Sequence, residues 1–352
     1  MLNHFKFYTK QDLLNQTRLR RYETKLGEKL RVVEDPLKLA EALAASSARF
    51  VLFGVPESIG IQANYGIGGA ETAWPSFIQS FVNIQSSDKF TGEEIMLPGF
   101  FDFSEVMRMI DSHSKSPDEK VDACRHAVAN ILDDEVEELV KTIIGSGKIP
   151  IVIGGGHNNC YPIIKGSAKA LHKLGKIARP QINAINLDAH ADFRIMEGRH
   201  SGNGFRYAME EGYLGKYAIV GLHENYNPQS MLDDLYSNIN IQYSFYEDIF
   251  MHERLNFMQS LAQAFSFTDD QFTIVELDLD AVEGVLSSAM TPSGISAIHA
   301  RQYMNFAGAN QQITAIHICE GAERLQNGLE NGHTGKLIAY LVSDFIKSAV
   351  FS

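Results

Sequence analysis

The chain has 352 residues, 45% of them hydrophobic and 21% charged, and a formal net charge of −12 at pH 7. This composition is typical of a soluble globular protein, and the length accommodates one large α/β domain or two ordinary ones. The negative charge argues against nucleic acid or an anionic membrane surface as the main partner.

The cysteines and the apolar stretches of the sequence indicate the cellular compartment in which the protein works. Three cysteines without metal-finger spacing predict reduced thiols in a cytoplasmic protein. The N-terminal residues lack a charged start followed by a long apolar core, so we expect no signal peptide. The most apolar stretch near the end, residues 337–351, is interrupted by charged residues. We therefore expect it to form an amphipathic helix that closes the core, and no membrane span.

Strands and helices are predicted to alternate along the chain. Residues 1–45 have a charged, helical pattern and are predicted to form a helical N-terminal extension. Helices are also expected at about residues 70–84 and 116–144, the second opening with proline and acids in its first turn. Apolar, β-branched runs predict about eight strands, near residues 50–54, 94–97, 149–153, 182–188, 217–222, 241–244, 272–278 and 313–319.

This alternation predicts one three-layer α/β/α sandwich with a mostly parallel sheet. The sequence shows no Pro/Ser-rich linker, internal repeat or low-complexity block that would mark a boundary between domains. We therefore expect a single domain over residues 1–352.

Three short segments that follow predicted strands carry six metal-type ligands: His157, Asp188, His190, Asp192, Asp278 and Asp280. The carboxyl ends of parallel strands meet at one edge of a sheet, and alternate side chains of an extended segment face the same side. We therefore expect the six side chains to converge. So many carboxylates and imidazoles in one place would repel one another strongly without cations between them, and two divalent ions would remove that repulsion. Imidazole ligands favour a transition metal such as Mn, Zn, Co or Fe over calcium. Each motif taken alone also fits a helix cap or a tight turn. The occurrence of all three motifs at the ends of predicted strands favours the metal site.

With these motifs, the chain from about Phe50 to its C-terminus resembles the ureohydrolase superfamily of arginases, agmatinases and formimidoylglutamases. The resemblance implies an arginase-like fold, two Mn²⁺ ions per subunit or other divalent transition metals in their place, and a bridging hydroxide that attacks a guanidino or formimidoyl carbon. It also implies a small-molecule amidine or amino-acid substrate and a homo-oligomer. By resemblance, one ion is held by His157, Asp188, Asp192 and Asp278. The other is held by Asp188, His190, Asp278 and Asp280, so Asp188 and Asp278 bridge the ions and count as catalytic.

Glu320 follows the apolar run at residues 313–319. It matches the family glutamate that binds the cationic C–N group of the substrate. A carboxylate at this position would hold an amidinium in line with the nucleophile. The alternative is an acid that caps a helix near Arg324.

The segment after the second ligand motif bears on the choice among family members. Arginases carry a histidine that shuttles protons where this chain has Phe205. Formimidoylglutamases carry an arginine just after the DxHxD motif and a Ser-Gly-x-x-Phe-Arg segment, and both are present here. N-formimidoyl-glutamate has two carboxylates, which guanidinium groups bind bidentately. The side chains predicted to bind this substrate are Arg194 and Arg206, with Ser201 and Asn203 as supporting donors. A surface salt bridge is the alternative for either arginine.

His200 is a candidate proton shuttle in place of the missing family histidine, and His223 is a candidate for lining the same cleft. The chain departs from the family pattern at Glu276, which stands where the third motif usually starts with serine. It also has Ile67 where many formimidoylglutamases have arginine.

The sequence thus predicts a hydrolase that converts N-formimidoyl-L-glutamate and water to L-glutamate and formamide, a step of histidine degradation. An arginase, an agmatinase or another guanidino-acid ureohydrolase releasing urea remains open. So does a non-catalytic, metal-binding relative.

Overall fold

The computed structural model describes residues 2–351 and contains one nine-stranded sheet within that range. The strands lie in the order β1-β3-β2-β4-β9-β8-β5-β6-β7. Every adjacent pair is parallel except β1 with β3. The strands are β1 (Phe5–Phe7), β2 (Phe50–Gly54), β3 (Ile95–Phe101), β4 (Ile149–Ile153), β5 (Ile182–Leu187), β6 (Leu214–Leu222), β7 (Ile241–Phe245), β8 (Thr273–Asp278) and β9 (Ile313–Cys319).

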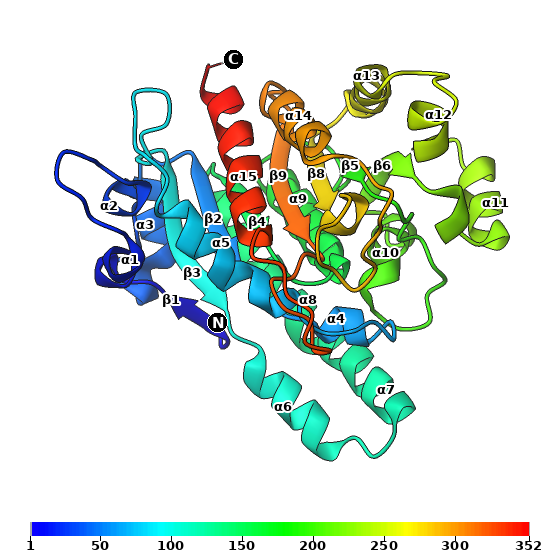
Figure 1. The fold of residues 1–352 in the computed structure, drawn as a ribbon, viewed down its shortest axis with the longest axis horizontal. Helices are drawn as coiled ribbons and strands as arrows, with labels where there is room; N and C mark the ends of the chain where they lie inside the picture. The colour runs from blue at the N-terminus through cyan, green and yellow to red at the C-terminus, as the bar shows by residue number, and fades with distance from the viewer. Residues whose placement is uncertain (1, 352) are drawn as a thin grey trace.

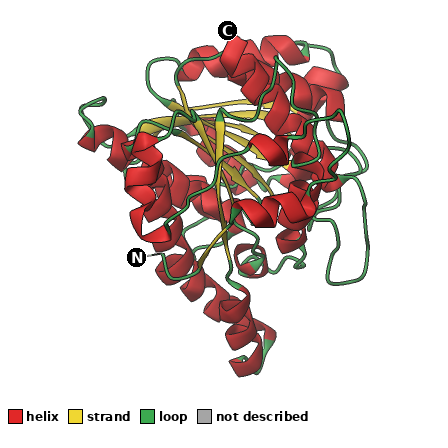
Figure 2. Ribbon diagram, turned by 90° about the vertical axis from the view of Figure 1, so that its left-hand side faces the viewer, coloured by secondary structure: helices red, strands yellow, loops and turns green. Residues whose placement is uncertain are grey.

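Helices cover both faces of the sheet, as Figures 1 and 2 show. The helices are α1 (Lys10–Gln16), α2 (Leu26–Lys29), α3 (Leu39–Ala45), α4 (Ile59–Gln62), α5 (Ala73–Phe81), α6 (Ser104–His113), α7 (Pro117–Ala127), α8 (Asp133–Gly145), α9 (Cys160–Lys173), α10 (Gly204–Glu210), α11 (Gln229–Ser237), α12 (Tyr246–Phe250), α13 (Phe257–Thr268), α14 (Ala297–Gly308) and α15 (Thr334–Phe351). The predicted three-layer α/β/α sandwich with a mostly parallel sheet is confirmed.

The core consists of two hydrophobic layers, one on each side of the sheet. Strand β2 shows why: Val51 and Phe53 pack into one layer, and Phe50 and Leu52 pack into the other. Alternate residues of a strand point to opposite faces, so a central parallel strand must be apolar throughout. Helices α8 and α9 contribute to the first layer, and α5, α13, α14 and α15 contribute to the second.

Strand β1 is not among the eight predicted strands. It has three residues and pairs antiparallel with β3, in the register Phe5↔Phe101. Such a short strand leaves no periodic signal. Residues 1–45 therefore hold an edge strand of the sheet in addition to the predicted helices.

The long helix predicted at residues 116–144 is present as α7 and α8, joined through the π-helical turn Val128–Leu132. Ser116 caps its start by accepting a hydrogen bond from the amide of Glu119. Helices α6 and α7 project from the body of the molecule (Figure 1). Among residues 2–351, no helix has both the length and the apolar composition that crossing a bilayer requires.

The topology brings four strand ends together. Strands β4, β9, β8 and β5 are consecutive neighbours in the middle of the sheet and all run parallel. Their carboxyl ends therefore open at one edge, which is where ligands bind in sheets of this type.

Candidate metal centre

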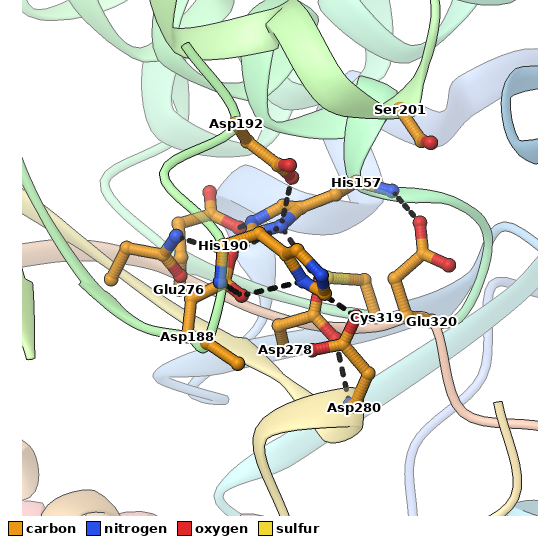
Figure 3. A network of polar contacts seen from close by, with 12 residues as sticks. His157, Asp188, His190, Asp192, Ser201, Glu276, Asp278, Asp280, Cys319 and Glu320 are labelled. Carbon is orange, nitrogen blue, oxygen red and sulfur yellow. Dashed lines mark hydrogen bonds and ion pairs between the residues drawn. The ribbon is translucent and has the colours of Figure 1, made fainter. Parts of the chain in front are cut away.

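The ligand residues predicted for one ion lie together at this edge. We call His157, Asp188, Asp192 and Asp278 the inner group. The Nδ1 atom of His157 lies 2.8 Å from Asp192 Oδ2, 3.1 Å from Asp278 Oδ2 and 3.3 Å from Asp188 Oδ2. Figure 3 shows these side chains pointing toward one another. Oxygen and nitrogen atoms at such spacings can surround one cation.

Asp188, His190 and Asp280 form a second cluster, the outer group. His190 Nδ1 lies 3.1 Å from Asp280 Oδ2 and 3.6 Å from Asp188 Oδ1. Asp188 belongs to both groups, with one oxygen toward each. Asp278, the second predicted bridge, stands in the inner group, while its Oδ1 accepts a hydrogen bond of 2.8 Å from the amide of Asp280.

The turn before His157 is shaped by glycines and by a buried acid. Gly154 and Gly155 both have positive φ, and a Cβ on Gly155 would lie 2.5 Å from Asn159 Nδ2. The fully buried carboxylate of Glu57 accepts hydrogen bonds from the Gly156 amide at 2.9 Å and from Asn159 Nδ2 at 2.8 Å. Sequence patterns gave no sign of Glu57, because it lies about a hundred residues away in the chain from the turn that it holds.

Two site residues have a strained backbone. Asp192 has φ 45° and Glu320 has φ 63°, in the left-handed region that residues other than glycine rarely adopt. Strain of this kind costs about 1–3 kcal/mol per residue and gathers at functional sites. Here it turns both carboxylates toward the cluster (Figure 3).

Electrostatics at the centre favours a cation. Burial raises the pKa of Asp192 to about 6. Burial, together with the charges of Asp280 and Asp188, raises the pKa of Asp278 well above its usual range. Asp280 Oδ1 is buried without a hydrogen-bond partner among the described residues. Buried carboxylates that repel one another are stable as anions when a metal ion lies between them, and this mixture of carboxylate and imidazole suits divalent transition metals. The residues therefore fit a two-metal site.

Glu320 lies beside the inner group. Its Oε1 accepts a hydrogen bond of 2.8 Å from the His157 amide, and Ser288 Oγ lies 3.4 Å from its Oε2. Burial raises the pKa of Glu320 to about 8. A positive group that binds next to this carboxyl group would stabilise its ionised form.

A cavity of about 120 Å³ opens onto this cluster. Its lining includes four of the six predicted ligands: His190, Asp192, Asp278 and Asp280. Glu320, Arg194 and Ser201, three of the residues predicted to bind substrate, also line it. The lining further includes Asn64, Tyr226 and Ser288, which are not among the residues predicted for the site.

Arg206 does not line the cavity, contrary to its predicted role. Its guanidinium pairs with Asp234 of α11, lies 3.6 Å from Glu210, and covers the ring of Phe193 at 4.3 Å. Arg206 stands on α10, and its ion pairs connect it to Glu210 of the same helix and to α11. The alternative of a salt bridge therefore describes Arg206 better than a role in binding substrate.

Asn203 and His200 are likewise buried outside the cavity lining. Asn203 donates to the carbonyl of Gly198 at 2.7 Å, and His200 Nδ1 accepts from the Gly202 amide at 3.1 Å. Both side chains thus hold the loop that follows the second ligand motif. Burial lowers the pKa of His200 to about 3, which does not suit a proton shuttle near neutral pH.

Arg199 is the arginine that the structure shows to be important in this loop. It is buried and donates to Asp133 of α8 through Nε at 2.9 Å, to Asn203 Oδ1 at 3.1 Å and to the Asn158 carbonyl at 2.8 Å. It therefore ties the loop to α8 and to the residue next to His157. Arg199 belongs to no sequence motif, and its partner Asp133 is 66 positions away in the chain.

We expect Arg199→Met to destabilise the protein by about 3–5 kcal/mol at pH 8, the usual cost of leaving one member of a buried ion pair unpaired. Burial already raises the pKa of Asp133 to about 6, against about 3.9 in an unfolded chain. A raised folded-state pKa means that stability falls as pH rises through this interval. Without Arg199 the pKa of Asp133 rises further, so the deficit should be smaller near pH 5 than at pH 8, where the lost hydrogen bonds to Asn203 and Asn158 and the unpaired carboxylate both contribute.

Urea unfolding of Arg199→Met at both pH values measures this effect. Arg254→Met is the control, because Arg254 forms an exposed ion pair with Asp248 and should cost at most about 1 kcal/mol. An equal deficit at pH 5 and pH 8 would contradict the role given to Asp133.

A stack of aromatic rings borders the outer group. Tyr226 lies parallel to His190 with ring centroids 5.2 Å apart and to His223 at 5.1 Å. His223 itself is buried behind Tyr226 and does not line the cavity. Tyr226 fixes the plane of His190 and forms part of the cavity wall.

Phe205, which the family resemblance places where arginases carry a histidine, is fully buried. Its ring meets that of His157 edge-on, with centroids 5.1 Å apart, and stacks on Tyr217 at 4.3 Å. An apolar ring here supplies no proton carrier and instead excludes water from one side of His157.

The chain is similar in sequence to formimidoylglutamases of two bacteria. The chain is 32% identical over 163 residues to a formimidoylglutamase of Macrococcus caseolyticus, which covers 46% of this chain and 47% of the relative. It is 26% identical over 258 residues to a formimidoylglutamase of Corynebacterium efficiens, covering 69% of this chain and 75% of the relative. The match spans about half of the M. caseolyticus protein.

Solved structures share the fold. The formiminoglutamase of Trypanosoma cruzi with Mn²⁺ has a TM-score of 0.68 at 18% identity and covers 94% of this chain and 99% of its own. The formimidoylglutamase of Bacillus subtilis has a TM-score of 0.71 at 16% identity, with coverages of 95% and 94%. The family model described as the arginase family matches residues 49–347. The chain belongs to the arginase family.

Proposed function

We propose that this protein hydrolyses N-formimidoyl-L-glutamate to L-glutamate and formamide at a centre that holds two Mn²⁺ ions. The observation that carries the proposal is the convergence of the inner and outer groups with Glu320 on one cavity whose lining includes Arg194. The formimidoylglutamases among its sequence relatives support the choice of substrate.

The residues of the centre would hold the two ions as two overlapping sets. Four ligands of the inner group would hold one ion, and Asp188, His190 and Asp280 would hold the other, with Asp188 between them. Ions held by these residues would lower the pKa of water at the site and so supply a hydroxide nucleophile near neutral pH. Asn186 Nδ2 donates to Asp188 Oδ2 at 2.8 Å and fixes that shared carboxylate.

Glu320 would orient the reacting end of the substrate. The formimidoyl group is a cationic amidine, and the buried carboxylate of Glu320 offers it a charge-assisted hydrogen bond. Its Oε1 is already engaged with the His157 amide, so Oε2, with Ser288 Oγ at 3.4 Å, is the oxygen that would accept from the substrate. This arrangement holds the amidine carbon beside the metal ligands, which is the orientation that attack requires.

Arg194 and Ser201 would bind the glutamate end. The side chain of Arg194 is 53% exposed and lies 3.9 Å from Glu197, so it is free to move toward a carboxylate in the cavity. Ser201 is buried in the lining, and Asn64 Nδ2 lies 3.5 Å from its Oγ. A guanidinium and a hydroxyl at one end, with a carboxylate at the other, match a substrate that is anionic at one end and cationic at the other.

The substrate is tested by a product assay on manganese-loaded protein. N-formimidoyl-L-glutamate, arginine, agmatine and guanidino acids are offered in parallel. Formamide and glutamate from the first compound alone would support the proposal. Urea from a guanidino compound would retain the metal centre but refute the substrate. Manganese binding without hydrolysis of any amidine would indicate a non-catalytic relative.

We expect Arg194→Met to raise KM for N-formimidoyl-L-glutamate about 10-fold, because an exposed guanidinium contributes about 1.5 kcal/mol through a charged hydrogen bond. The metal ligands are untouched, so kcat should change little. Arg206→Met is the matched control, since Arg206 pairs with Asp234 outside the cavity lining. Steady-state kinetics of both variants measure the difference. A larger rise in KM for Arg206→Met would reverse the assignment.

We also propose that the protein works as a cytoplasmic homo-oligomer. Its three cysteines, Cys124, Cys160 and Cys319, are free and buried, which suits a reducing compartment. Light scattering coupled to size-exclusion chromatography measures the oligomeric state.

A further inference from the structure

A buried polar cluster lies against the inner group but outside the cavity lining. It consists of Glu276, His317 and Cys319, all fully buried, in contact with the ring of His157. Glu276 on β8 and His317 on β9 are direct neighbours across the parallel pair. These side chains bind no substrate in the proposed reaction, and burying a carboxylate is costly unless it has partners.

The two ring nitrogens of His157 face different surroundings. Nδ1 faces the carboxylates of the inner group, at 2.8–3.3 Å. Nε2 is buried, has no hydrogen-bond partner among the described residues, and lies 3.5 Å from Glu276 Oε2. An imidazole that binds a cation through one nitrogen carries a proton on the other, and that N–H needs an acceptor. Glu276 is the acceptor in place.

Glu276 is itself held in position. His317 Nδ1 lies 2.6 Å from Glu276 Oε2, and His317 Nε2 lies 3.3 Å from the carbonyl oxygen of Gly154. The cluster therefore connects Gly154, at the start of the turn that carries His157, with the ring of His157. Glu276 Oε1 is also buried and unpartnered. The nearer carboxyl oxygen, Oε2, lies 3.5 Å from Nε2 of His157.

We propose that Glu276 is a positioning residue for the metal centre. It accepts the Nε2–H of His157 and holds Nδ1 toward the ion of the inner group, while His317 fixes the direction of the carboxylate. Because His157 belongs to the inner group and not to the outer group, Glu276 controls the affinity of one ion and leaves the other unchanged. The inference rests on the proposed metal centre and is independent of the substrate.

Calorimetric titration of metal-free protein with Mn²⁺ tests the proposal. Glu276→Met removes the acceptor at similar volume and should weaken binding of one ion about 10–100-fold, the usual effect of losing a partner of a metal-bound histidine. Binding of the second ion should change by no more than a few-fold. Glu276→Gln keeps an acceptor oxygen and should recover most of the lost affinity. Cys319→Ala, in the same cluster, should bind both ions as the parent does.

Several outcomes would overturn the proposal. If the Glu276→Met variant binds both ions with parental affinity, Glu276 only forms a structural ion pair with His317. Equal weakening of both ions, together with a lower melting temperature of the metal-free protein, would show general destabilisation. A third equivalent of metal in the parent, lost in both Glu276 variants, would make the cluster a metal site of its own. Failure of the parent to bind two ions would instead refute the proposed metal centre.

A measurement on the parent protein remains decisive if Glu276→Met does not fold. In protein labelled with ¹⁵N-histidine and loaded with diamagnetic Zn²⁺, the Nε2–H of His157 should give a slowly exchanging, hydrogen-bonded proton resonance. Glu276→Gln should shift this resonance, because a neutral acceptor replaces a charged one. A His157 Nε2–H in fast exchange with water would overturn the proposal.

Discussion

Asp278→Asn is expected to lower kcat/KM for N-formimidoyl-L-glutamate by about 10⁴-fold or more. Each tenfold loss corresponds to about 1.4 kcal/mol of transition-state stabilisation. Metal ions supply several kcal/mol of that stabilisation, which is lost with an ion. Asp278 is 2% exposed, and its Oδ2 lies 3.1 Å from His157 Nδ1. An amide in its place supplies no negative charge and binds divalent cations poorly. The variant should therefore retain fewer than two ions.

Metal content by mass spectrometry, measured with the rate of formamide release, checks this result. Asp270→Asn is the control: Asp270 lies just before the same strand, is 57% exposed and pairs with Lys216. It should retain both ions and full activity. An Asp278→Asn protein that holds two ions and a tenth of the parental rate would contradict the assignment of Asp278.

Glu320→Gln is expected to lower kcat/KM about 100-fold, because a charge-assisted hydrogen bond to a buried carboxylate contributes about 1.5–3 kcal/mol. Glutamine has the same shape and still accepts from the His157 amide, so the turn at His157 should persist. Glu320 is outside both ligand groups, and metal content should therefore stay at the parental value.

The comparison with Glu323→Gln isolates the role of the charge. Glu323 follows closely in the chain, accepts from Ser76 Oγ at 2.8 Å, and does not line the cavity. Its variant should act like the parent. If Glu320→Gln retains parental kcat/KM, the amidine is bound by another group. If it loses metal, Glu320 acts on the ligands instead of the substrate.

The features that could be predicted from the sequence are those contained in one short run of residues. Strand β5 and the alternating ligands Asp188, His190 and Asp192 stand together in the chain, so one run of residues carries both the strand and its site. The parallel sheet then brought His157 and Asp280 to the same edge, as the strand–helix alternation implied. Strand β1 escaped prediction because three residues show no period, and its partner β3 lies far along the chain.

The ion pairs and hydrogen bonds that support the site could not be predicted from the sequence, because they connect segments that are distant in the chain. Arg194 and Arg206 both match the motifs that predict substrate binding. Only Arg206 stands on α10, where it pairs with Asp234. Arg199 carried no motif, and its ion pair with Asp133 exists only once α8 packs beside the loop. Glu276 departs from the family pattern in the sequence, but its proposed role follows only from the strand register that places it next to His317.

Manganese titration of metal-free protein, followed by formamide release from N-formimidoyl-L-glutamate, tests the central claim most directly. The proposed centre predicts activity that rises to a plateau at two equivalents of Mn²⁺ per chain, with no urea from arginine or agmatine under the same conditions. A plateau at one equivalent, or two bound equivalents with no formamide, would contradict the proposal that this cavity is a two-metal formimidoylglutamase site.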